Sequence, residues 1–100
     1  MKNAPKPPAD LSDAGKKVWK KIFAEIEIDT AAVLLLDVMM QSWDRMQEAR
    51  AAIAKDGATV TGRFGLKASP WTAIERDSAA TVTRCWRLLG FDQQPPPGVR

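Results

Sequence analysis

The lysines of the first helical segment are the residues whose type and spacing could do chemistry. They form two adjacent pairs one helical turn apart, at Lys16, Lys17, Lys20 and Lys21. This spacing puts all the ammonium groups on one face of a helix, where they could contact the phosphates of a nucleic acid. Lys2 and Lys6 lie upstream and would add to that positive charge. The alternative is an ordinary solvated face, in which Lys21 pairs with Glu25 four residues later.

A second basic group lies further along the chain, on the glycine-rich stretch "GRFGLKA". Arg63 and Lys67 flank the aromatic Phe64 there, and such a basic-aromatic tip could contact DNA or a protein partner. The alternative is a simple turn in which Phe64 folds back onto the helices. The net charge of +3 is compatible with a nucleic-acid partner and does not require one.

The composition argues against catalysis. The chain has no histidine and a single cysteine, Cys85, which excludes histidine-containing zinc sites, Ser-His-Asp triads and Cys-His pairs. One cysteine allows no intrachain disulfide and fits a reducing cytoplasm. We expect surface charges, with no partner for acid-base chemistry, at Asp44, Glu48, Glu75 and Asp77. The sequence therefore predicts no enzyme activity, no cofactor and no metal site.

Capping signals divide the chain into three helices, so we expect an all-α subunit with a long central helix. Ser12 opens a helix over residues 12–27, whose apolar stripe Val18, Trp19, Ile22, Phe23 and Ile26 lies opposite the lysines. Asp29 or Thr30 caps a helix over 30–55, and Gly57 ends it. Ser69-Pro70 opens a helix over 70–89, which ends before Gly90. Glycines three apart predict a short β-hairpin-like connector over 58–68. The prediction has a flexible arm at 1–10, a helical domain at 11–92 and a Pro-rich tail at 93–100.

The start of the central helix, "AAVLLLDVMM", is apolar on nearly every side and must be covered on more than one side. It is also too short for a membrane span of about 20 residues. Ala32, Met39, Met46 and Ile53 then repeat every seven residues, like the seam of a short coiled coil. We expect a homo-oligomer whose subunit contacts include Leu34, Leu35, Val38, Met39, Trp43 and Phe64.

Three stretches, in this order, resemble one known family. They are "LSDAGKKVWKKI", "ARAAIAKDGATVT" and "GRFGLKASPWTAIERDSAATVTRCWRLLGF". Together they resemble the P27-type small subunit of phage terminase, in which a Leu-Ser helix start bearing a Trp precedes a long Ala-rich helix, a T-V-T-x-R-F-G segment and a Pro-led helix with E-R-D. The similarity covers about residues 10–92.

The resemblance implies a non-catalytic DNA-packaging component in the cytoplasm of a host cell. Such subunits assemble as rings, engage viral double-stranded DNA and pass it to the terminase large subunit, which holds the ATPase and the nuclease. Many carry a helix-turn-helix ahead of the ring-forming core, whereas here only the short arm precedes the first helix. We therefore expect the DNA contact to be weak or non-specific.

A different class of function stays open at this stage. The chain could be a small helical adaptor or antitoxin-like regulator that binds a protein partner through the seam of the central helix and touches no DNA. Mass separates the two hypotheses. A ring-forming subunit should elute at several times 11 kDa, and an adaptor as a monomer or dimer.

Overall fold

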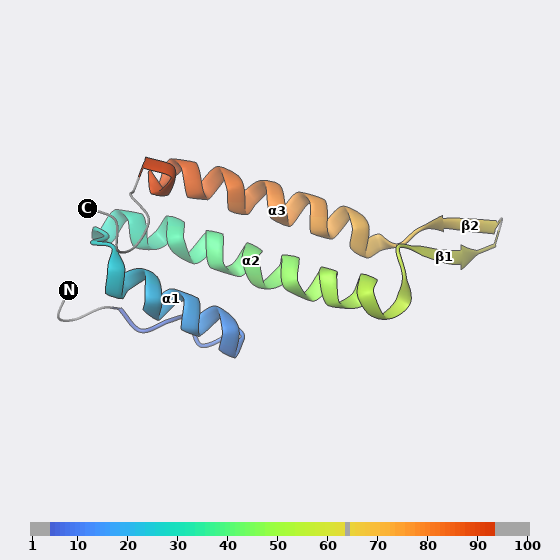
Figure 1. The fold of residues 1–100 in the computed structure, drawn as a ribbon, viewed down its shortest axis with the longest axis horizontal. Helices are drawn as coiled ribbons and strands as arrows, with labels where there is room; N and C mark the ends of the chain where they lie inside the picture. Colours follow the sequence, from blue (N-terminus) through green and yellow to red (C-terminus); the bar gives the residue numbers. More distant parts are fainter. Residues whose placement is uncertain (1–4, 64, 94–100) are drawn as a thin grey trace.

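Three α-helices and one β-hairpin make up the computed structural model, which describes residues 5–63 and 65–93 (Figure 1). The elements are α1 (Asp13–Glu25), α2 (Thr30–Asp56), β1 (Thr59–Gly62), β2 (Gly65–Ala68), α3 (Pro70–Leu88) and a short 3-10 helix, η1 (Phe91–Gln93). Helices α2 and α3 run antiparallel and side by side, and α1 packs near the start of α2. The hairpin extends past the other end of the α2/α3 pair, giving a molecule of 56 × 27 × 25 Å.

The caps read from the sequence set the helix bounds. The side chains of Ser12, Asp29 and Ser69 each accept a hydrogen bond from a backbone N–H of the first turn, at 2.9, 2.8 and 3.2 Å. Gly57 ends α2 with a positive φ of 87°, a conformation that costs glycine little and other residues more. The three-helix prediction and the β connector are therefore confirmed, and the ring stays a prediction.

The apolar core lies where α1, α2 and α3 meet, at the end of the molecule away from the hairpin. It joins Trp19 and Phe23 of α1 to residues of α2 and to Cys85 and Phe91, with Leu36 fully buried. As its all-round apolar start predicts, α2 is covered on more than one side. The seam residues Ala32 and Met39 lie in the same cluster as Val82, Cys85 and Leu89 of α3, so α3 of the same chain covers this part of the seam.

The hairpin makes few contacts with the rest of the chain. Its antiparallel register pairs Thr59 with Ala68 and Gly62 with Gly65, and most of its residues are exposed. A backbone hydrogen bond of 2.9 Å from Ser69 N to Ala58 O closes its base. An isolated two-stranded hairpin is only marginally stable in water. Phe64 lies outside the described residues.

Residues 5–10, the described part of the predicted arm, lie against the helices. The indole N–H of Trp19 donates to the Pro5 carbonyl at 3.0 Å, and Gln41 Nε2 donates to Asp10 Oδ1 at 3.0 Å. Leu11 is buried and its N–H donates to the Pro8 carbonyl. The division into arm, domain and tail stays a prediction, since residues 1–4 and 94–100 lie outside the described part. Within the described ranges, no helix is long and apolar enough to cross a membrane.

Candidate nucleic-acid interface

The rotation of α1 about its own axis is fixed by its apolar stripe. Trp19 and Phe23 are buried and their ring centroids lie 5.2 Å apart, while Val18 and Ile22 pack at the edge of the same core. The lysines on the opposite side of the helix therefore point away from α2. Lys17, Lys20 and Lys21 are exposed and Lys16 is half-buried. We call these four residues the lysine face.

None of the lysine face is engaged in an ion pair with another described residue. The ion pairs between described residues include Arg45–Glu48, Arg50–Glu75 and Arg76–Asp77, and none of these involves a lysine of α1. The pair between Lys21 and Glu25 that the spacing allowed is not formed. The four ammonium groups are gathered on one helix face, and no carboxylate of the described residues forms an ion pair with them. This arrangement favours an anionic partner.

The start of α1 is held on α2 by one carboxylate. Asp44 accepts hydrogen bonds from the backbone N–H of Ser12 and from its hydroxyl, both at 2.7 Å, while the Ser12 hydroxyl oxygen accepts from Gly15 N. Gly15 is buried, and a Cβ at that position would lie 2.7 Å from Asp44 Oδ1. We expected Asp44 to be a surface charge. It is instead the residue that positions the N-terminal end of the lysine face.

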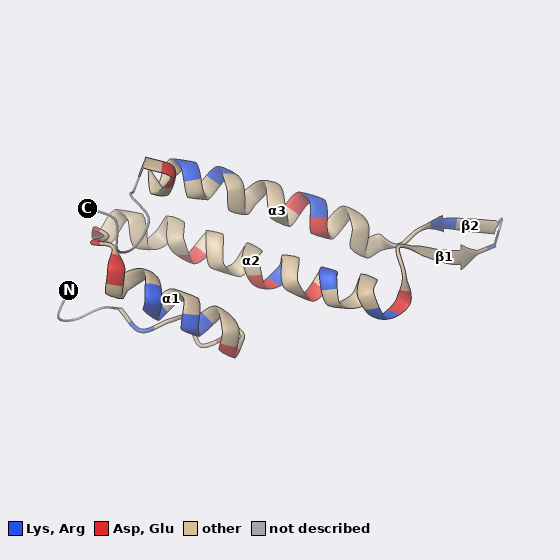
Figure 2. Cartoon of the chain, in the orientation of Figure 1, with Lys and Arg blue, Asp and Glu red and all other residues tan. Residues whose placement is uncertain are grey.

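The two basic groups expected from the sequence lie in separate parts of the molecule (Figure 2). Lys6 is exposed and follows Pro5, which is bonded to Trp19, so it lies beside α1. Arg63 and Lys67 are exposed on the hairpin at the far end of α2. Lys2 lies outside the described residues. The lysine face with Lys6, and not the hairpin, is therefore the larger group of cations in one place.

The residues expected at a subunit boundary differ in how far the chain itself buries them. Leu34 is 74% exposed and Val38 is 50% exposed, so both are available to a second copy. Leu35 and Trp43 are half-buried against the core. Met39 is 3% exposed within the chain's own core, so its burial needs no second copy. Phe64, the remaining residue of the prediction, lies outside the described part.

The described residues offer no cluster of metal-ligating side chains. In the part of the chain that the structure describes, no group of three or more Asp, Glu or Cys side chains could hold a metal ion. Cys85 is a free thiol buried in the core.

The chain matches one known protein family over most of its length. Residues 15–94 match the family model described as phage terminase, small subunit. The chain belongs to this family. The chain matches no curated protein and no solved structure. Terminase small subunits are generally non-catalytic, in agreement with the expectation that this chain is not an enzyme.

The match covers every helix and the hairpin, apart from the first two residues of α1. The lysine face and the exposed start of α2 therefore both belong to the part of the chain that defines the family. Sequence reasoning missed the Ser12–Asp44 contact, since 32 residues separate its partners and no local pattern signals it. It also gave no role to Arg84 and Arg87, which lie on α3 off its apolar face.

Proposed function

We propose that this chain is the small subunit of a DNA-packaging terminase of a phage or phage-like particle. It assembles with copies of itself in the host cytoplasm, engages viral double-stranded DNA and presents that DNA to the large subunit, which supplies the ATPase and nuclease. The family match over residues 15–94 is the observation that carries the proposal. An adaptor acting through the α2 seam is less well supported, because α3 already packs on that seam.

The DNA contact is made mainly by the lysine face, with help from Lys6 and Lys2. The lysine face is free of ion pairs within the described residues, and the packing of Trp19 and Phe23 holds it toward solvent. Ammonium groups recognise phosphates and carry little sequence information, so binding is weakly sequence-selective. One copy offers few phosphate contacts. Assembly repeats the lysine face, so weak single contacts add through effective concentration.

The test is a binding titration with a long random-sequence DNA duplex at low salt, followed by fluorescence anisotropy. The variant Lys16→Gln/Lys17→Gln/Lys20→Gln/Lys21→Gln should lose binding while keeping the oligomer mass and the helical circular dichroism spectrum of the parent. The matched control is Arg63→Ala/Lys67→Ala, which removes the other basic group and should bind as the parent does.

Two results would count against the proposed contact. Binding that survives in the lysine variant and disappears in the hairpin variant moves the DNA site to the hairpin. An absence of binding in the parent at low salt assigns DNA engagement to another component of the packaging complex. A salt titration adds a quantitative check. The plot of log affinity against log salt becomes less steep by about 0.9 for each phosphate that the protein no longer neutralises.

A further inference from the structure

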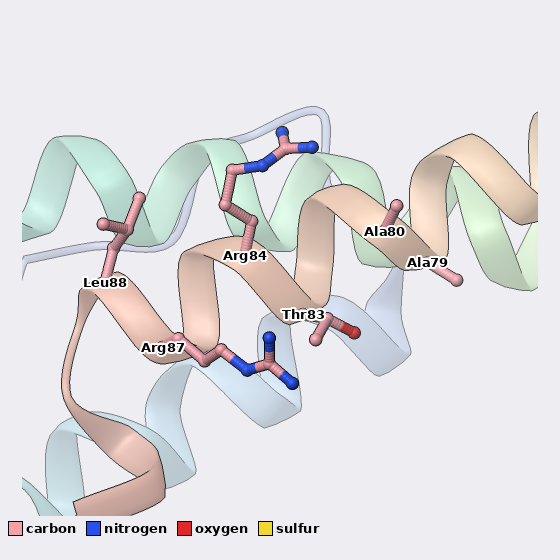
Figure 3. Close-up of a pocket in the computed structure, with 6 residues that line it drawn as sticks. All are labelled: Ala79, Ala80, Thr83, Arg84, Arg87 and Leu88. Atoms are coloured by element: carbon pink, nitrogen blue, oxygen red, sulfur yellow. The ribbon is translucent and has the colours of Figure 1, made fainter.

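The outer surface of α3 carries a hollow that takes no part in the proposed DNA contact. The hollow has a volume of about 530 Å³ and is lined by Ala79, Ala80, Thr83, Arg84, Arg87 and Leu88. We call it the α3 hollow. Figure 3 shows Arg84 and Leu88 on one side of the helix and Thr83 and Arg87 on the other. The small side chains of Ala79 and Ala80 leave room between these larger residues for side chains of a partner.

The start of α2 carries two projecting apolar side chains that match such a hollow. Leu34 and Val38 are one helical turn apart, so they lie on the same face of α2. Their exposed fractions of 74% and 50% show that neither α1 nor α3 covers them. We call Leu34 and Val38 the knob pair. Contiguous exposed apolar surface is a feature of protein–protein contact sites.

The two surfaces also carry opposite charges. From residue 22 to residue 44 the chain has carboxylates and no lysine or arginine, and Asp37 lies next to the knob pair. From residue 78 to residue 91 it has Arg84 and Arg87 and no carboxylate. Neither arginine takes part in an ion pair of the described residues. The two surfaces are therefore complementary in charge.

The fold puts these two surfaces at the same level of the molecule. Because α2 and α3 are antiparallel, the first half of α2 lies beside the second half of α3, at the end away from the hairpin (Figure 1). A rotation about an axis parallel to the long axis of the molecule can therefore bring the knob pair of one copy to the α3 hollow of the next. Because the two surfaces differ, the contact is heterologous and repeats from copy to copy, closing into a ring if the rotation closes.

We propose that Leu34 and Val38 of one copy pack into the α3 hollow of a second copy, where Arg84 and Arg87 face the carboxylate of Asp37. This inference rests on the self-assembly in the proposed function and names its two surfaces. The half-buried Leu35 and the buried Met39 stay within the protomer. The lysine face lies on another helix and is not used by the contact.

The experiment uses two variants of the full chain, each of which disrupts one of the two surfaces. Leu34→Asp removes the larger knob, and Ala80→Glu fills the hollow and places a carboxylate there. Both positions are exposed, so circular dichroism should show the parent's helix content. Ala24→Glu, at an exposed alanine of α1, is the matched control and should assemble like the parent. Sedimentation velocity over a concentration series gives the mass of each variant and of an equimolar mixture.

We expect the parent and the control to form a multi-subunit species and each variant alone to stay near 11.0 kDa. The mixture should form a species of twice that mass and no larger, because the intact knob pair of the Ala80 variant fits the intact hollow of the Leu34 variant. A mixture that stays monomeric at the highest concentration overturns the pairing of these surfaces. Variants that assemble like the parent overturn it too, while leaving the proposed function intact. A monomeric parent overturns the inference together with the assembly that it rests on.

Discussion

The contact between Ser12 and Asp44 should be a measurable part of the stability of the protein. Asp44→Ala removes two hydrogen bonds of 2.7 Å from a charged acceptor, and each such bond contributes about 1.5 kcal/mol at the lower end of its range. Asp44 is half-buried, so water replaces part of the loss. We therefore expect the free energy of unfolding to fall by about 2 kcal/mol. Ser12→Ala should cost about as much, since it also removes the helix cap.

The assay is urea unfolding followed by circular dichroism at one fixed protein concentration, so that assembly contributes equally to every variant. Glu48→Ala is the matched control, because Glu48 lies one turn after Asp44 on the same helix and forms only an exposed ion pair with Arg45. Such a pair contributes at most about 1 kcal/mol. The double variant Ser12→Ala/Asp44→Ala should lose less unfolding free energy than the two single variants lose together, because both changes remove the same contact. An Asp44→Ala variant as stable as Glu48→Ala, or strict additivity in the double variant, would refute the reasoning.

Three further predictions concern the core, the helix contact and the DNA contact. Leu36→Ala leaves a cavity at a fully buried site and should lower the free energy of unfolding by about 3 kcal/mol. The control Leu34→Ala, at an exposed site, should lower it by less than about 0.5 kcal/mol. Both are measured by urea unfolding at low protein concentration. Gly15→Ala places a methyl group 2.7 Å from Asp44 Oδ1 and should cost about 1–2 kcal/mol in the same assay, although alanine is the better helix former. Raising the salt concentration should release DNA in an anisotropy titration before it lowers the oligomer mass, because the knob pair is apolar and the lysine face is not.

The helices and the hairpin could be predicted from the sequence because their signals are local. Ser12, Asp29 and Ser69-Pro70 cap the turns that follow them directly, and Gly57 ends α2 within its own turn. The predicted helix bounds differ from the observed ones by two residues at most. Each of these signals acts over a few residues, so no knowledge of the tertiary structure is needed to read it.

What could not be predicted is how α1 and α3 share the surface of α2. The stretch "AAVLLLDVMM" is apolar on most sides, so its periodicity does not say which side chains the chain buries itself. The structure buries Leu36, Met39 and Met40 and leaves Leu34 and Val38 exposed. The contacts that fix this choice join distant residues, such as Ser12 with Asp44 and Arg50 with Glu75. The spacing of the four lysines predicts that they share one side of α1. Their lack of ion pairs with described residues could not be predicted from the sequence.

The way α1 attaches to α2 leaves separate surfaces for the two proposed roles, assembly and DNA binding. The apolar stripe of α1 and Ser12 contact one side of α2, and α3 packs on another side. The knob pair occupies a third side, and the α3 hollow faces away from the seam. The lysine face is the part of α1 that no packing requires, so a second copy on the knob pair leaves it open. Charge follows the same division, since the cations of α1 end at Lys21, before the acidic stretch that accompanies the knob pair. The proposed DNA contact and the proposed contact with a second copy therefore use different faces of the molecule.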